Sequence, residues 1–259
     1  MVIEHEPGDL TCTVAADVPL GELQRVVARG GQMLALDPPG GDGITVGEAF
    51  ATAGSGPRAH RYGPPRDLVL GMTVRLADGT VARAGGRVVK TVAGYDLPKL
   101  LTGAHGRLGE ILELTLRLHP LPASTCTVVT TPTDPLVLEP LAPACVEYAW
   151  PPERMLVRFE SPVARVLAEQ AAQLVGGDLQ DDDDALWADH RELAAGLPLT
   201  RCAPADVPDT IAQLRAAGAT TIVGRYARGL LHADVNIECL APDIHRVALE
   251  RRVVEAYGG

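Results

Sequence analysis

Aromatic residues are scarce in this 259-residue sequence, at 3 % of the total, although apolar residues as a whole make up 46 %. An apolar fraction of this size is typical of a globular chain. The length is sufficient for one large domain or two small ones. We therefore expect cores built mainly from leucine, valine, isoleucine and alanine.

The sequence also lacks any run rich in lysine or arginine, and its formal net charge is −10. Nucleic acids and anionic membranes attract basic surfaces, so neither is expected as a partner. No apolar run approaches the roughly 20 residues that a transmembrane helix needs. Acidic residues follow Val2-Ile3 directly, which does not fit a signal peptide. These features favour a soluble, cytoplasmic protein.

Clustered cysteines are absent as well, because no C-x-x-C pair occurs and the five cysteines are scattered: Cys12, Cys126, Cys145, Cys202 and Cys239. Neither an iron–sulfur cluster nor a structural zinc is encoded by such a pattern. The run Asp181–Asp184 is predicted to be a solvated loop. His232 and Asp234 share a strand face by simple alternation. No metal site is expected.

The common nucleotide-binding fingerprints are missing too, since neither G-x-G-x-x-G after a strand nor G-x-x-x-x-G-K-[ST] is present. No Ser/His/Asp or Cys/His constellation can be identified. The sequence does contain a stretch rich in small residues, Ile44–Gly71, with Gly54-Ser55-Gly56 near its middle. Successive backbone N–H groups in such a loop can bind an anion, while a plain glycine-rich surface loop is the alternative.

Three further stretches give this loop a context: residues 85–97, which contain KTVAGYDL, residues 103–111, and a strand from Leu112 to Leu118. In this order the set resembles the FAD-binding domain of the flavoenzyme family that includes p-cresol methylhydroxylase. Within that family it is most similar to the FAD-binding subunits of bacterial glycolate oxidases. The WADHRE segment at 187–192 also fits this resemblance.

The resemblance implies FAD as the cofactor, bound without a covalent link and mainly through backbone groups of small residues. A proline-rich corner would lie beside the flavin, two loops would meet the phosphates, and a third segment would border the adenine. The residues implied in these roles are Pro39, Thr45, Val46, Gly47, Gly54, Ser55, Gly56, Gly63, Gly109 and Ile111. Arg58, His60 and Arg61 either face the flavin or a substrate carboxylate, or form an exposed cluster. The catalytic base cannot be identified.

The predicted fold class is α+β. Residues 1–122 are expected to form a partial p-cresol methylhydroxylase-type FAD-binding domain, and residues 123–259 a smaller antiparallel sheet covered by helices. Asp78-Gly79 predicts a hairpin, and Leu112–Leu118 predicts a strand with one buried face. Leu10, Cys12 and Val14 alternate with threonines and predict another half-buried strand. The prolines in 119–122 mark the domain boundary.

By the same resemblance, the chain oxidises a small 2-hydroxy acid and passes electrons to partners, namely a second flavoprotein subunit and an iron–sulfur subunit. Family members carry another cofactor-clamping lobe before the strand that Val2–Glu6 resembles, and Glu48 replaces a usual glycine. The alternative is therefore a truncated relative or a non-catalytic, flavin-free assembly subunit. Without that lobe, an apolar patch near Val2, Ile3, Leu10 and Cys12 is expected at the surface.

Overall fold

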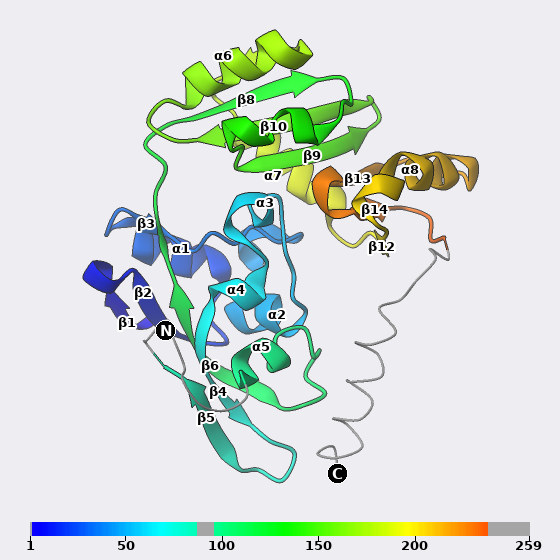
Figure 1. The fold of residues 1–259 in the computed structure, drawn as a ribbon. Coiled ribbons are helices and arrows are strands. Elements are labelled where there is room, and N and C mark those ends of the chain that lie inside the picture. The colour runs from blue at the N-terminus through cyan, green and yellow to red at the C-terminus, as the bar shows by residue number, and fades with distance from the viewer. Residues whose placement is uncertain (1, 87–95, 238–259) are drawn as a thin grey trace. The chain divides into compact units, whose positions relative to one another are not determined.

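The computed structural model describes residues 2–86 and 96–237, so most of the KTVAGYDL segment lies outside the described residues. The chain divides into two compact units, each with its own sheet (Figure 1). The division after Leu121 falls within the predicted proline-rich boundary. The short segment Pro57–Tyr62 belongs to the second unit, although both of its neighbours in sequence belong to the first.

The first unit contains a five-stranded antiparallel sheet. Its strands, in spatial order, are β1 (Val2–Glu6), β2 (Thr11–Ala15), β6 (Glu110–Arg117), β4 (Val69–Arg75) and β5 (Val81–Gly85). A separate two-stranded ladder joins β3 (Gln32–Met33) to β7 (His119–Pro120).

Local sequence signals account for much of this sheet. The predicted hairpin between β4 and β5 is confirmed, because Gly79 adopts a φ of +83° and the Thr80 amide donates to Asp78 Oδ1 at 2.8 Å. In β6, Leu114 and Leu116 are buried in the core, and Glu113 and Thr115 alternate with them. The core face is covered by helices α1 (Leu20–Ala28), α2 (Val46–Ala51), α4 (Pro65–Leu68) and α5 (Leu97–Leu101).

Strand β2 differs from its prediction, because both of its faces are buried. Thr11 and Thr13 are only 5 % and 8 % exposed, and Cys12 is 2 % exposed. The strand lies between β1 and β6, and the hydroxyls of Thr13 and Thr115 form a hydrogen bond of 3.1 Å that satisfies the buried polar groups. The Cys12 side chain, predicted to lie close to an exposed apolar patch, is itself buried, whereas Ile3 is half exposed.

The second unit contains a seven-stranded antiparallel sheet. Its spatial order is β11 (Asp178–Gln180), β8 (Thr125–Thr130), β10 (Arg154–Glu160), β9 (Cys145–Trp150), β13 (Ile222–Arg225), β14 (Leu230–Ala233) and β12 (Leu199–Arg201). The sequence predicted an antiparallel sheet smaller than the first, but this one has more strands. The short strands β11 and β12 extend its two edges.

The two faces of this sheet differ in chemistry. One face is apolar and packs against α6 (Ala164–Val175) and α8 (Val207–Ala216). The other face lies under α7 (Asp184–Ala194), and Figure 1 shows α6 and α7 on opposite sides of the strands. This second face carries buried polar and charged side chains, including Thr127, Glu147, Arg158, Glu160, Arg225 and His232.

Short helical turns complete the structure. The α-helical turn α3 (Ala59–Tyr62) lies in the second unit. Turns of 3-10 helix occupy Pro7–Asp9, Gly41–Gly43, Pro135–Val137, Glu139–Leu141, Pro204–Asp206 and Tyr226–Arg228.

The prediction that all of Asp181–Asp184 is solvated is wrong for Asp183, which is 1 % exposed. Its carboxylate accepts hydrogen bonds from Thr125 Oγ1 at 3.0 Å, Thr127 Oγ1 at 2.7 Å and Arg158 at 2.7 Å. A buried carboxylate is stable only when it is paired and hydrogen-bonded in this way. Asp183 therefore fixes the start of α7 to β8 and β10.

Replacing Asp183 by alanine should lower the free energy of unfolding by about 3–5 kcal/mol, because Arg158 would then lose a buried counter-charge. Asp182→Ala is the matched control, since its exposed neighbouring side chain should change stability by no more than about 0.5 kcal/mol. Urea unfolding of both variants measures the difference. Equal stabilities for the two variants would contradict the role given to Asp183.

Candidate functional site

Helix α2 organises the predicted cofactor stretch in the first unit. Thr45 begins it, with its hydroxyl accepting the Glu48 amide at 3.1 Å. The Val46 and Gly47 amides donate to the carbonyls of Val18 and Ala16 at 2.9 and 2.8 Å. The roles of Thr45, Val46 and Gly47 at a flavin stay predictions. The two engaged amides would have to exchange partners to bind a phosphate.

The C-terminal end of α2 holds a second predicted segment in place. The Gly103 amide donates to the Phe50 carbonyl at 2.9 Å, and the His105 amide donates to the Ala51 carbonyl at 2.8 Å. The loop that leads to Gly109 is therefore attached to the same helix as the glycine-rich stretch. Stretches that are some 55 residues apart in sequence are brought together by these two hydrogen bonds.

Gly56 lies against the proline-rich corner. A Cβ atom at Gly56 would lie 1.6 Å from the Asp37 carbonyl oxygen, so only glycine permits this approach. At Gly54 a Cβ would lie 3.4 Å from Pro38 Cβ, which is ordinary contact. Gly54 and Gly56 therefore lie against Pro38 and Asp37, the two residues directly before Pro39.

Three other predicted residues lie at turns or strand ends of the same unit. Gly63 has a φ of +86°, in the region that favours glycine, and packs against the Asp67 side chain. Gly109 has a φ of +147° and lies close to the Arg75 carbonyl. Ile111 pairs with Val74 in the β4–β6 ladder. Each backbone conformation serves the fold, and the cofactor roles of these residues remain predictions.

The chemistry of the glycine-rich stretch is that of backbone groups and small side chains. Residues 44–56 contain no lysine or arginine, and Glu48 is exposed on α2. A cofactor bound here would be contacted by peptide groups and the Ser55 side chain, not by cationic side chains. An FAD phosphate bound here would therefore be met by neutral donors alone, with the Glu48 carboxylate on the same helix.

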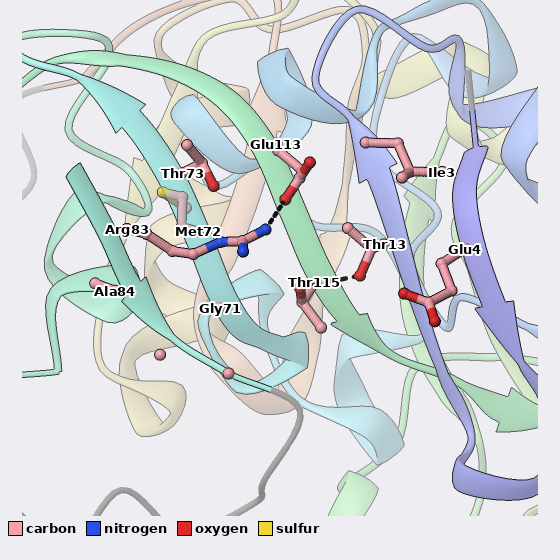
Figure 2. A pocket seen from close by; sticks show the side chains of 12 residues that line it. Ile3, Glu4, Thr13, Gly71, Met72, Thr73, Arg83, Ala84, Glu113 and Thr115 are labelled. Carbon is pink, nitrogen blue, oxygen red and sulfur yellow. Dashed lines mark hydrogen bonds and ion pairs between the residues drawn. The ribbon is translucent and has the colours of Figure 1, made fainter. Parts of the chain in front are cut away.

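A pocket of about 320 Å³ lies on the five-stranded sheet of the first unit, on the polar face opposite the covering helices (Figure 2). Arg83 on β5 points toward Glu113 on β6, and the two form an ion pair of 2.6 Å. Glu4 adds a second carboxylate to the lining. With two carboxylates and one paired arginine, the pocket disfavours an anionic ligand. None of the ten predicted cofactor residues lines it.

Arg58, His60 and Arg61 belong to the second unit. Arg58 Nε donates to Glu160 Oε1 at 3.0 Å, and Arg61 donates to the Glu160 carbonyl at 2.9 Å. His60 Nε2 lies 3.3 Å from Glu139 Oε1, and burial lowers the pKa of His60. The two arginines thus bind the chain itself, a third possibility that the sequence did not suggest.

Sequence reasoning also missed the buried titratable side chains on this face of the sheet, namely Glu147, Arg158, Glu160 and His190. His190 Nε2 lies 3.0 Å from Glu147 Oε2, and both side chains are almost fully buried. The alternation of charged and apolar residues in β10 was the available signal, but it is equally typical of a solvated face. The position of α7 decides between a solvated and a buried face, because α7 covers the side of the sheet that carries the charged residues.

Metal binding finds no support among residues 2–86 and 96–237, where no group of three or more candidate ligands converges. Asp234 Oδ1 instead accepts the amides of Thr220 and Thr221 at 2.9 and 3.1 Å. His232 is buried, which lowers its pKa, and its Nδ1 lies 3.3 Å from the Leu197 carbonyl.

In the same described ranges, no helix is long and apolar enough to cross a membrane.

Comparison with known families supports the sequence interpretation. Residues 1–85 match the family model described as an FAD binding domain. Glycolate oxidase subunit GlcE of Escherichia coli is 35 % identical over 125 residues, which are 48 % of this chain and 36 % of that protein. Glycolate oxidase subunit GlcD of Bacillus subtilis is 29 % identical over 187 residues, 68 % of this chain and 40 % of that protein. The predicted resemblance is confirmed.

Two further similarities concern function and fold. The mitochondrial D-lactate dehydrogenase (cytochrome) 1 of Saccharomyces cerevisiae is 36 % identical over 129 residues, 49 % of this chain and 22 % of that protein. The matches thus span less than half the length of these relatives. A solved alkyldihydroxyacetonephosphate synthase, 15 % identical, superimposes with a TM-score of 0.69 over 99 % of this chain and 63 % of that chain. This similarity confirms the fold class, and the family match supports FAD as the cofactor.

The close approach at Gly56 predicts a large effect of a single methyl group. Gly56→Ala should destabilise the first unit by about 1–3 kcal/mol or more, because the new Cβ would overlap Asp37. Gly43→Ala is the matched control, since no atom lies within 4 Å of its ideal Cβ. Unfolding in urea without added flavin gives both values. A Gly56→Ala protein as stable as the control would contradict this packing.

Proposed function

From the match of residues 1–85 to the FAD binding domain, we propose that this chain is the FAD-binding part of an oxidoreductase that acts on a small 2-hydroxy acid. The matched relatives are named for glycolate or D-lactate, and both compounds are 2-hydroxy acids. This shared substrate class is the observation that supports the proposed reaction. The α+β architecture is consistent with it.

In this proposal the flavin supplies the acceptor for the hydride that leaves the carbinol carbon, and the protein supplies position and electrostatics. Helix α2, loop 54–56 and the segment at Gly109–Ile111 would hold the cofactor without a covalent bond. Ser55 would add a hydroxyl donor. Gly63 would complete the set, and the corner at Pro39 would lie beside the ring.

We further propose that the chain works within a multi-subunit assembly in the cytoplasm. Two of its relatives are named as subunits. The cysteine pattern of this sequence does not encode an iron–sulfur cluster. Electrons would therefore leave through partners, namely a second flavoprotein subunit and an iron–sulfur subunit. Co-purification with such subunits from the native host supports this assembly, whereas a monomer that captures neither counts against it.

A flavin-free assembly subunit is the second candidate, and a specific observation favours it. The Val46 and Gly47 amides are already engaged within the chain, and Gly56 is explained by its contact with Asp37. These features would persist in a relative that keeps the fold without the cofactor. Such a subunit would co-purify with its partners but carry no flavin of its own.

A charge at Ser55 tests the cofactor site. Ser55→Asp should weaken FAD binding about tenfold or more relative to Ser55→Asn, because the two side chains have the same shape and only the aspartate repels the phosphates. Ser55 is partly exposed, so both variants should fold. Flavin fluorescence titration of the purified proteins measures the affinities. Gly47→Asp is less informative, because its Cβ would lie 2.7 Å from Ala16 Cβ whether or not flavin binds.

Three outcomes separate the candidates. A flavin spectrum that acid precipitation releases, together with dye reduction by glycolate or D-lactate, supports the oxidoreductase. Flavin that stays with the precipitate contradicts non-covalent binding, and equal affinities for the two Ser55 variants contradict the placement of the phosphates. Protein that binds partners but no added FAD identifies the assembly subunit.

A further inference from the structure

The segment Pro57–Tyr62 connects two predicted flavin-contacting positions, since it follows Gly56 and precedes Gly63. Both glycines lie in the first unit, whereas the segment itself packs in the second. The segment includes a single turn of helix, α3. Residues directly before and after such a short, anchored segment have little freedom to move independently of it.

Glu160 at the end of β10 holds this segment. Its side chain has no solvent exposure, and its two carboxylate oxygens accept Arg58 Nε at 3.0 Å and the Tyr62 hydroxyl at 3.1 Å. The Glu160 carbonyl accepts Arg61 at 2.9 Å. Arg228 donates to the Ala59 carbonyl at 2.7 Å. Four contacts therefore bind six residues of chain to the second unit.

The protonation state of Tyr62 suits this role. Burial, assisted by the negative charge of Glu160, raises the pKa of Tyr62 to about 12. A raised pKa keeps the phenol protonated throughout the physiological range, so Tyr62 remains a hydrogen-bond donor to the carboxylate.

The hydrogen bonds and ion pairs around Glu160 continue across the same face of the seven-stranded sheet. Arg158 lies 3.6 Å from Glu160 Oε1 on one side and 2.7 Å from Asp183 Oδ1 on the other. Trp187 in α7 donates from Nε1 to Thr127 at 2.8 Å, and Thr127 in turn donates to Asp183. A continuous network thus joins segment 57–62 to α7.

We propose that Glu160 is a positioning residue for the cofactor, because it holds residues 57–62 and thereby orders Gly54–Gly56 and Gly63 on either side. The inference rests on the proposed function, since it takes these glycines as flavin contacts. Ordering a loop before the ligand arrives reduces the conformational entropy lost on binding and so increases affinity. Glu160 acts through the loop and is not itself a catalytic group.

The rate of tryptic cleavage measures how firmly segment 57–62 is held, because trypsin cleaves after Arg58 and Arg61. This measurement needs no flavin. In the flavin-free full-length protein, Glu160→Gln should speed cleavage at these two bonds by at least about tenfold, the factor expected for losing a hydrogen bond to a charged group. Glu169→Gln is the control, because it makes the same change in an exposed ion pair with Arg165. Tyr62→Phe, which loses one hydroxyl, should give a smaller increase and covers the case in which Glu160→Gln does not fold.

Flavin fluorescence titration of the same variants reports the consequence for the cofactor. Faster cleavage together with an about tenfold weaker FAD affinity supports the proposal. If trypsin cleaves Glu160→Gln at the rate of Glu169→Gln, Glu160 does not hold segment 57–62 in place. Faster cleavage with an affinity equal to that of the wild type overturns the positioning role. If the wild type itself binds no FAD, the proposed function fails, and the anchor is judged on the cleavage rates alone.

Discussion

The arrangement of the second unit depends on the hydrogen bonds and ion pairs of the buried Glu160 carboxylate. A carboxylate without solvent exposure is costly unless opposite charges and hydrogen-bond donors surround it. Arg58, Tyr62 and Arg158 meet this requirement. The need to satisfy this group explains why residues 57–62 lie with the second unit and why one face of the sheet keeps charged side chains in its interior.

The first unit is governed by a different constraint, the close approach of backbone segments. Gly47 packs directly on Ala16, and Gly56 packs on Asp37, so a side chain at either position would overlap a neighbour. Glycine-rich sequences are often interpreted as ligand cradles, but the packing of these two glycines requires glycine even without a ligand. Evidence for FAD therefore comes from the family match and from the grouping of the stretches around α2, not from the glycines themselves.

Features with local signals could be predicted from the sequence. The turn at Asp78-Gly79 and the alternation in β6 each depend on residues a few positions apart, and both are present. The burial of Asp183 and the docking of Arg58 depend on distant partners. Arg58 and Glu160 are 102 residues apart, so no local pattern could reveal that they meet.

The candidate site likewise combines features that the sequence could reveal with features that it could not. Its residues were identified by resemblance, and the structure brings the corner at Pro39, loop 54–56 and the segment before Gly109 together around one helix. The sequence could not show that the Val46 and Gly47 amides already have partners in the chain. Nor could it show that the basic residues after the loop are bound by a buried acid.

A double-mutant cycle on Arg58 and Glu160 tests the central interaction most directly. The two single alanine variants and the double variant would be unfolded in urea, and the coupling free energy obtained from the three changes. Because Glu160 is fully buried and Arg58 is 19 % exposed, we predict a coupling of about 2 kcal/mol or more. A coupling below about 0.5 kcal/mol, as for an exposed pair, would contradict this account.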